Sequence, residues 1–297
     1  MIRLALRVRR DQAELVLAEL LELVPAGVEE ADAGEDVVYA VYGAPGELPS
    51  LPDLQAAAGP ALVAVTTTEV ADDWQERWRR FHRPVVIPAP AGQKRAGVRD
   101  GGVPALLVRP PWEPARDAGA AGLEIVIDPG QAFGTGAHAS TRLCLKLLVE
   151  LAGAGPRRGA LLDVGTGSGV LAIAAARLGF APVLGVDNGR ESVEAARANA
   201  AVNDAALTVL QLDLRRESPP PPGGDERRWS VVTANLLSPL LCELARVMRP
   251  APDHLIAGGL LAGQAPDVAT AFSAHLGMRE RERRAEGEWE ALWLSLA

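Results

Sequence analysis

The chain has 297 residues, of which 48% are hydrophobic, and a formal net charge of −8 at pH 7. This apolar content is enough for one large domain with a small one, or for two medium-sized domains, and it excludes an intrinsically disordered chain. The two cysteines, Cys144 and Cys242, lie far apart without a Cys-x-x-Cys or a nearby pair of histidines. We therefore expect neither a disulfide framework nor a structural metal site.

The first residues do not resemble a targeting segment. Met1–Arg7 alternates arginine with apolar residues and lacks the continuous apolar stretch of a signal peptide. No later run is long and charge-free enough to span a bilayer. We expect a cytoplasmic, monomeric protein that has no membrane partner.

The acidic residues are concentrated at the start of the chain. Up to Thr66 there are eleven acidic and four basic residues, whereas the remainder is almost neutral. A negative surface repels a phosphate backbone and attracts a basic partner, although a merely solvated surface explains the same pattern. We expect a basic protein as partner and no direct readout of nucleic acid.

Residues 1–68 are predicted to form a small α+β domain. Its elements follow the order strand, helix, strand, strand, helix, strand, predicted at 2–9, 11–23, 27–31, 36–42, 51–58 and 61–68. This order is the split βαβ arrangement of ferredoxin-like domains, which are common small recognition modules. We therefore assign residues 1–68 to substrate recognition.

Residues 69–83 are predicted to link this domain to a larger one. Within them, residues 70–81 place Trp74, Trp78 and Phe81 on one side of an amphipathic helix, because positions i, i+4 and i+7 share a face. We interpret this helix as a linker, although ordinary core packing produces the same stripe.

Residues 84–297 are predicted to form an α/β domain with a doubly wound, Rossmann-like sheet. Apolar runs in the Pro- and Gly-rich region 84–128 first suggest an antiparallel extension. Strands and helices then alternate, with helices at 139–151, 168–178, 190–202, 238–248 and 264–275, and strands at 160–164, 183–187, 207–212, 230–234, 254–258, 278–284 and 288–296. Such alternation is typical of a parallel sheet covered by helices on both faces.

A glycine-rich turn follows the first strand of this domain. The segment Leu161–Gly169 runs from an apolar strand through Gly165, Thr166 and Gly167 into a helix, at the position where doubly wound sheets bind their ligands. A dinucleotide fingerprint would have glycine where Val170 stands, so a pyrophosphate site is disfavoured. Asp163, just before the turn, is expected to accept hydrogen bonds from loop amides or from a ligand ammonium.

A second carboxylate supports a nucleoside-binding turn. Asp187 ends the next strand, 22 positions after Gly165, where its two oxygens can accept the hydroxyls of a ribose. The alternative is that the glycines serve only the packing of helix against strand. The turn, the helix and the spaced aspartate together favour ligand binding.

These residues resemble motif I and the acidic residue of class I S-adenosylmethionine-dependent methyltransferases. Two further segments resemble the PrmA family of bacterial ribosomal-protein methyltransferases: the loop Asp128–Thr141, with its Phe-Gly-Thr-Gly sequence, and Ala234-Asn235-Leu236 at a strand end. The resemblance covers nearly the whole chain, including Glu286-Gly-Glu-Trp289 near its end.

The resemblance implies S-adenosylmethionine as cofactor. The implied substrate is large-subunit ribosomal protein eleven, free or in the ribosome, methylated on lysine side chains and on its N-terminal amine. The residues expected to contact the cofactor or frame its methyl group are Phe133, Thr141, Gly165, Thr166, Gly167, Gly169, Asp187, Asp213 and Asn235. Of these, Asp213 would meet the adenine amino group, and Phe133 would cover the methyl site or anchor its loop.

Two departures from the family pattern concern this site. Ser140 stands where the family usually has threonine, which keeps a hydroxyl. Asn188-Gly189 replaces the more usual pair after the ribose-binding aspartate, so the adenine-side contacts are not carried over.

Asn235 is the expected catalytic residue. Methyl transfer from a sulfonium is an in-line displacement, so the protein must hold an uncharged amine behind the methyl carbon. Asn235 can accept a hydrogen bond from that amine and aim it without acting as a strong base. His138 is the one candidate for a general base in these loops, although a lone histidine in a glycine-rich loop more often orders the loop.

Two other functions are compatible with the sequence. One is a methyltransferase that acts on a different protein, a nucleic acid or a small molecule; the absence of a basic face and of an Asn-Pro-Pro-Tyr segment disfavours the nucleic acid and amide-type substrates. The other is a catalytically silent cofactor-binding module in ribosome assembly.

Overall fold

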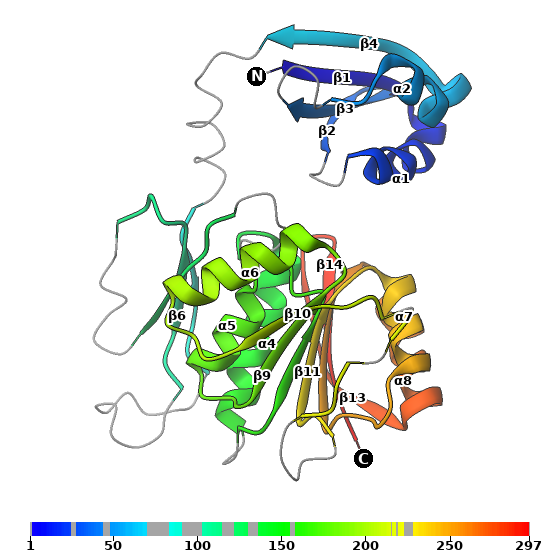
Figure 1. Ribbon diagram of the computed structural model, residues 1–297. Helices are drawn as coiled ribbons and strands as arrows, with labels where there is room; N and C mark the ends of the chain where they lie inside the picture. The colour runs from blue at the N-terminus through cyan, green and yellow to red at the C-terminus, as the bar shows by residue number, and fades with distance from the viewer. Residues whose placement is uncertain are drawn as a thin grey trace. The chain divides into compact units, whose positions relative to one another are not determined.

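The computed structural model describes residues 2–24, 28–43, 48–69, 83–90, 103–114, 122–129, 136–154, 158–214, 216–217, 219–222 and 228–296. The chain divides into two compact units, Met1–Phe81 and His82–Ala297 (Figure 1). The helix predicted at 70–81 lies outside the described residues.

The described part of the first unit has a four-stranded antiparallel sheet with two α-helices. Its elements are β1 (Ile2–Arg9), α1 (Ala13–Leu23), β2 (Glu29–Ala33), β3 (Asp36–Gly43), α2 (Leu51–Ala58) and β4 (Leu62–Glu69). The strand order β2-β3-β1-β4 is that of a ferredoxin-like fold, which confirms the predicted α+β arrangement. Leu6 of β1 lies between Tyr39 and Val65 on the neighbouring strands and is fully buried. The unit therefore has a hydrophobic core of its own.

The second unit contains a seven-stranded sheet. Its strands and helices are α4 (Ala139–Ala154), β8 (Leu161–Val164), α5 (Val170–Arg177), β9 (Val183–Asp187), α6 (Arg190–Val202), β10 (Thr208–Gln211), β11 (Val231–Asn235), α7 (Ser238–Val247), β12 (His254–Leu261), α8 (Ala265–Leu276), β13 (Met278–Glu286) and β14 (Trp289–Leu296). The strand order is β10-β9-β8-β11-β12-β14-β13, with β14 antiparallel to both of its neighbours. The order reverses between β8 and β11, which confirms the predicted doubly wound sheet.

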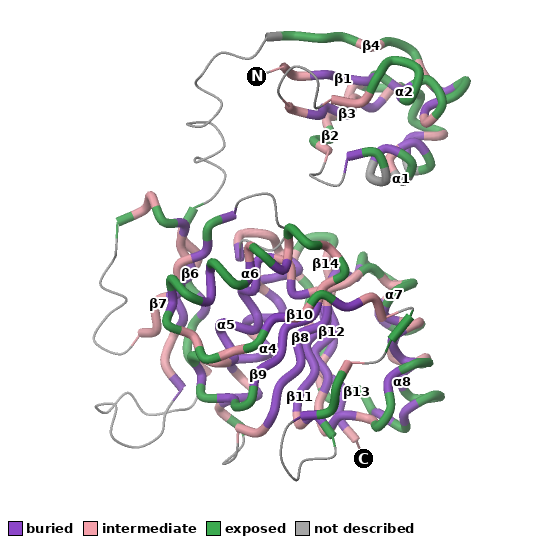
Figure 2. Tube along the Cα trace, in the orientation of Figure 1, coloured by how far each residue is buried: buried purple, intermediate pink, exposed green. Residues whose placement is uncertain are grey.

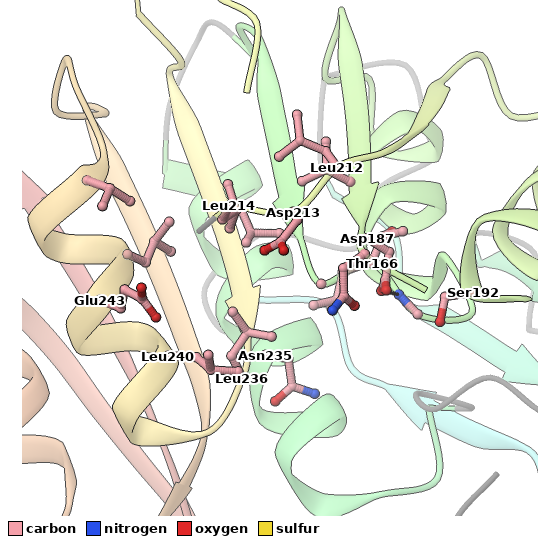
Figure 3. Close-up of a pocket in the computed structure, with 18 of the residues that line it drawn as sticks. Thr166, Asp187, Ser192, Leu212, Asp213, Leu214, Asn235, Leu236, Leu240 and Glu243 are labelled. Carbon is pink, nitrogen blue, oxygen red and sulfur yellow. Dashed lines mark hydrogen bonds between the residues drawn. The ribbon is translucent and has the colours of Figure 1, made fainter. Parts of the chain in front are cut away.

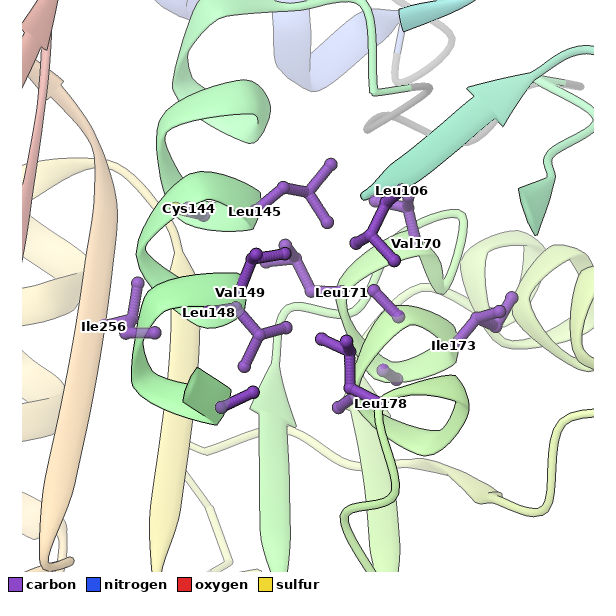
Figure 4. Close-up of a cluster of buried hydrophobic side chains, with 14 of the residues drawn as sticks. Leu106, Cys144, Leu145, Leu148, Val149, Val170, Leu171, Ile173, Leu178 and Ile256 are labelled. Carbon is purple, nitrogen blue, oxygen red and sulfur yellow. The ribbon is translucent and has the colours of Figure 1, made fainter. Parts of the chain in front are cut away.

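Helices cover both faces of this sheet (Figure 1). One hydrophobic cluster joins α4 and α5 to the sheet through side chains such as Leu145, Leu148 and Ile173 (Figure 4). A second cluster packs α7 and α8 against the opposite face, with Leu241 and Phe272 fully buried. The central strands are accordingly buried along most of their length (Figure 2). This explains why their sequences are continuous apolar runs rather than alternating patterns.

Several element boundaries differ from the prediction, and two of the differences have an identifiable reason. Helix α5 begins at Val170 and not at residue 168, because Gly169 has a φ of +85° and ends the preceding turn in a left-handed conformation. Strand β12 continues to Leu261, three residues beyond its predicted end, because it pairs with β14 there.

The extension before the large sheet is mixed, so the prediction that it is antiparallel was wrong. Strands β5 (Val85–Ile87) and β6 (Leu106–Arg109) are antiparallel, but β7 (Leu123–Val126) runs parallel to β6. Apolar runs alone carry no information about strand direction, because the same periodicity fits both pairings.

Two buried asparagines, one in the last turns of α6 and one that follows the helix, hold the end of β7 and the chain that leaves it. The side chain of Asn203 pairs with the backbone of Val126, accepting from its N–H at 2.8 Å and donating to its carbonyl at 2.6 Å. Asn199 accepts from the N–H of Asp128 at 2.9 Å and donates to the carbonyls of Asp128 and Ser168. These amides take the place of a neighbouring strand and fix the start of the segment that leads to α4.

We predict that Asn199→Ala destabilises the second unit. The substitution removes the hydrogen bonds that Asn199 makes with backbone groups of Asp128 and Ser168, which costs about 2–3 kcal/mol of unfolding free energy. Urea unfolding followed by circular dichroism measures the change. Glu194→Ala on the exposed face of the same helix is the control and should change the free energy by less than about 0.5 kcal/mol. Equal effects of the two substitutions would contradict the role of Asn199.

Candidate functional site

A cavity of about 380 Å³ lies at the carboxyl ends of the parallel strands (Figure 3). It opens where the strand order reverses, between β8 and β11, which is the usual ligand position in doubly wound sheets. Seven residues predicted from the sequence line it: Thr141, Gly165, Thr166, Gly167, Asp187, Asp213 and Asn235. The carboxyl ends of four strands, β8, β9, β10 and β11, and the start of α4 bring them together.

The turn after β8 requires glycine at its first position. Gly165 has a φ of +69°, and a Cβ there would lie 2.4 Å from Cδ2 of Leu236. Its N–H and that of Thr166 both donate to the carbonyl of Val186, at 2.9 and 3.0 Å. The turn is thus tied to the neighbouring strand β9 and passes close to the chain that follows β11.

Asp187 ends β9 with both carboxylate oxygens hydrogen-bonded to backbone amides. Oδ2 accepts from the N–H of Gly167 at 2.9 Å, and Oδ1 accepts from the N–H of Gly189 at 2.9 Å. Each carboxylate oxygen has a second lone pair. The aspartate therefore orders the glycine turn and retains acceptor capacity at the cavity wall.

Asp163 has a different role from the one expected, because it does not line the cavity. Only 1% of its surface is exposed, and its oxygens accept from the hydroxyls of Thr166 at 2.7 Å and Thr233 at 2.6 Å. Thr233 is its partner in the register between β8 and β11. Burial raises the pKa of Asp163 to about 6. The carboxyl group therefore joins the turn, β8 and β11 from below the site.

Asn235 presents an unsatisfied acceptor. Its Nδ2 donates to Oγ1 of Thr141 at 3.2 Å, whereas its Oδ1 is buried and has no hydrogen-bond partner among the described residues. A Cβ at Gly258 on the neighbouring strand β12 would lie only 3.1 Å from this oxygen. A buried carbonyl without a donor is costly, so the Oδ1 of Asn235 is the acceptor in this site that is available to a donor from outside the described residues.

The remaining predicted residues lie in different surroundings. Asp213 follows β10 in the cavity wall, and its carboxylate lies 3.5 Å from Nε of the exposed Arg216. Gly169 does not line the cavity; a Cβ there would meet Ala196 of α6 at 3.1 Å, so this glycine serves the packing of two helices. Phe133 lies outside the described residues.

His138 is engaged at the start of α4. Its Nδ1 lies 2.8 Å from Oγ of Ser140 and accepts from the backbone N–H of the same residue at 3.4 Å. Since that amide can only donate, the ring nitrogen acts as an acceptor. Burial and the nearby Arg142 lower the pKa of His138, so its ring is neutral at pH 7. These contacts are those of a helix cap, which favours the loop-ordering interpretation over the general base.

Sequence reasoning missed the wall that α7 contributes. Leu240, Glu243, Leu244 and Val247 share one face of this helix and line the cavity (Figure 3). Their spacing of three and four residues was a detectable signal, but it equally fits a helix packed on the sheet. With Asp187 and Asp213, Glu243 makes three carboxylates, and none of the described lining residues is Lys, Arg or His. The electrostatics of the cavity favour a cationic ligand.

The described residues contain neither a metal-binding cluster nor a membrane-spanning helix. No group of three or more His, Cys, Asp or Glu side chains is arranged to hold a metal ion. No helix in the described part of the chain is long and apolar enough to cross a membrane.

We predict that Asp163→Asn removes a pH dependence of stability. The pKa of Asp163 is raised from 3.8 to about 6 in the folded state, so its contribution is fully present below about pH 4 and is lost as the pH rises through 6. The loss amounts to at most about 3 kcal/mol. Urea unfolding of both proteins at several pH values between about 4 and 7 should show wild type losing stability relative to the variant. A constant difference would contradict the assignment.

Comparison with known proteins gives consistent results. The family model of the ribosomal protein L11 methyltransferases (PrmA) matches residues 54–296. The ribosomal protein L11 methyltransferase of Pelotomaculum thermopropionicum is 38% identical over 240 residues, which cover 79% of this chain and 69% of that protein. The one of Syntrophotalea carbinolica is 34% identical over 307 residues, covering 94% and 92%.

A solved structure shares the fold of the second unit. The crystal structure of ribosomal protein L11 methylase from Lactobacillus delbrueckii subsp. bulgaricus superposes with a TM-score of 0.55 at 30% identity, covering 64% of this chain and 94% of that one. The family model and the relatives above both match most of the sequence. The chain belongs to the ribosomal protein L11 methyltransferase (PrmA) family.

Proposed function

We propose that this chain transfers methyl groups from S-adenosylmethionine to lysine side chains and the N-terminal amine of ribosomal protein L11. Membership of the family and the names of the relatives support the substrate. The observation that carries the chemistry is the buried Oδ1 of Asn235, which lacks a donor among the described residues.

The residues of the cavity fit this cofactor. S-adenosylmethionine, when bound, supplies a methyl group carried on a positively charged sulfur. Asp187 offers two acceptors suited to ribose hydroxyls, next to a glycine turn that the backbone of a ligand can approach closely. All three charged side chains that line the described wall are negative. A cation is therefore attracted to the cavity and an anion is repelled.

Asn235 is suited to orient an amine nucleophile. A lysine ammonium has no lone pair, and with a reference pKa of about 10.4 its neutralisation at pH 7 costs about 4–5 kcal/mol. The Oδ1 of Asn235 accepts a hydrogen bond from the neutral amine and holds its lone pair toward the reacting carbon. An amide oxygen does not retain a proton at neutral pH, so Asn235 orients the amine and does not deprotonate it.

We further propose a division of labour along the chain. Residues 1–68 recognise the substrate, residues 69–83 link the two parts, and residues 84–297 carry out methyl transfer. The acidic excess up to Thr66 supports the first assignment, because ribosomal proteins are basic. The cavity supports the last one, because the described residues that line it all lie in the segment from Thr141 to Val247.

We predict that Asn235→Ala lowers methyl transfer by about 100-fold, because the amine loses the acceptor that orients it. Mass spectrometry of ribosomal protein L11 after incubation with enzyme and S-adenosylmethionine measures the methyl groups added, and calorimetry measures cofactor binding. Asp187→Ala is the matched comparison and should mainly weaken binding. Wild type that binds the cofactor but adds no methyl group would contradict the proposal and favour a silent module.

We also predict that a chain beginning at Asp72 binds the cofactor normally but methylates free ribosomal protein L11 poorly. Loss of the acidic segment should raise KM for the protein substrate by about tenfold or more, because attraction to a basic partner is lost. Steady-state kinetics with varied ribosomal protein L11 measures this effect. Equal KM values for the two chains would refute the recognition role.

A further inference from the structure

The turn between β13 and β14 contacts the start of α4, although neither of its contacting residues lines the cavity. Glu286 ends β13 and Trp289 begins β14. Both residues follow α4 by more than 130 positions in the sequence, so only the fold brings them close to this helix. No step of the proposed reaction has yet used them.

Glu286 binds two cations of α4. Its Oε1 accepts from Nε of Arg142 at 2.8 Å and from Nη2 of Arg142 at 2.5 Å, and its Oε2 accepts from Nζ of Lys146 at 2.8 Å. These hydrogen bonds hold the pKa of Glu286 below its usual value, so the carboxylate stays ionised at neutral pH. A guanidinium bound through two nitrogens has a defined orientation.

Arg142 extends this contact to the residues that precede the helix. Its Nη1 donates to the carbonyl of Ala137, and its backbone N–H donates to the carbonyl of His138 at 3.0 Å. Trp289 contacts the ring of His138 edge-on, with 4.6 Å between the ring centroids. The turn thus holds both residues immediately before α4.

The first turn of α4 in turn orients the catalytic amide. Thr141, next to Arg142, is fully buried, and its hydroxyl accepts from Nδ2 of Asn235. This bond determines which end of the amide faces Thr141 and leaves Oδ1 without a partner. A shift of the helix start would therefore move the acceptor on which the proposed chemistry depends.

We propose that Glu286 is a positioning residue for methyl transfer, acting through Arg142 and the start of α4 on Thr141 and Asn235. This inference rests on the proposed function, in which Asn235 orients the amine. Glu286 does not line the cavity proposed to hold the cofactor and the amine, so it acts on the position of the start of α4. A displacement of about 1 Å at a reacting group is enough to lower a rate by up to about 100-fold.

The chain offers a matched control for Glu286. Glu150 of α4 binds Arg284 of β13 at 2.7 Å, so this ion pair joins the same two elements two helical turns further from the site. The side chains of Glu286 and Arg142 are 32% and 27% exposed, and those of Glu150 and Arg284 are 27% and 33% exposed. Glu286→Gln and Glu150→Gln therefore each remove a carboxylate that joins α4 to β13, at different distances from Asn235. Glu286 binds two cations, whereas Arg284 keeps Glu282 as a second partner when Glu150 is replaced.

We expect Glu286→Gln to lower kcat about tenfold, with KM for ribosomal protein L11 and the affinity for the cofactor little changed. Glu150→Gln should lower kcat less than about twofold. The second readout needs neither cofactor nor substrate: hydrogen exchange at the amides of Ser140 and Arg142 should become faster in Glu286→Gln but not in Glu150→Gln.

Three outcomes would overturn the inference. These are equal kcat values for the two variants, a loss of kcat in Glu286→Gln without faster exchange, or faster exchange without a loss of kcat. Absence of methyl transfer by wild type would refute the proposed function instead, and the exchange experiment would still report whether Glu286 orders the start of α4.

Discussion

The buried carboxyl group of Asp163 is the interaction on which the rest of the site depends. It accepts hydrogen bonds from Thr166 in the glycine turn and from Thr233 in β11, so it ties the glycine turn to β11 at the point where the strand order reverses. Burying an acid raises its pKa, here to about 6, and this costs stability at neutral pH. This loss of stability occurs next to a ligand site, where an ordered glycine turn contributes more to function than maximal stability does.

Three asparagines differ in whether the protein itself supplies hydrogen-bond partners for both ends of the side-chain amide. Asn199 and Asn203 are buried asparagines whose oxygens and nitrogens all have backbone partners, and they hold the segment after β7. Asn235 is the exception, because its Nδ2 is bonded to Thr141 and its Oδ1 has no donor among the described residues. The amides of Asn199 and Asn203, with all partners present, suit a structural role. The amide of Asn235, with an oxygen that lacks a donor, suits the proposed functional role.

Helix α4 connects the ligand cavity to the far edge of the sheet. Its buried face packs on the sheet, Thr141 reaches the cavity, and its outer face carries Arg142 and Lys146, which bind the β13–β14 turn. The two added strands at that edge therefore do more than extend the sheet. They bind the helix whose first turn, in the proposed mechanism, positions the amide of Asn235.

The sequence by itself determined the order of strands and helices in both units, the glycine turn and the strand-end residues Asp187 and Asn235, because these depend on local periodicity and on short motifs. The tertiary structure alone decided that Asp163 faces inward, that Gly169 packs on a helix, that β7 is parallel to β6 and that Glu243 lines the cavity. Each of these depends on which segments, distant along the chain, become neighbours. Hydrophobic patterns identify a buried face but not the partner that covers it.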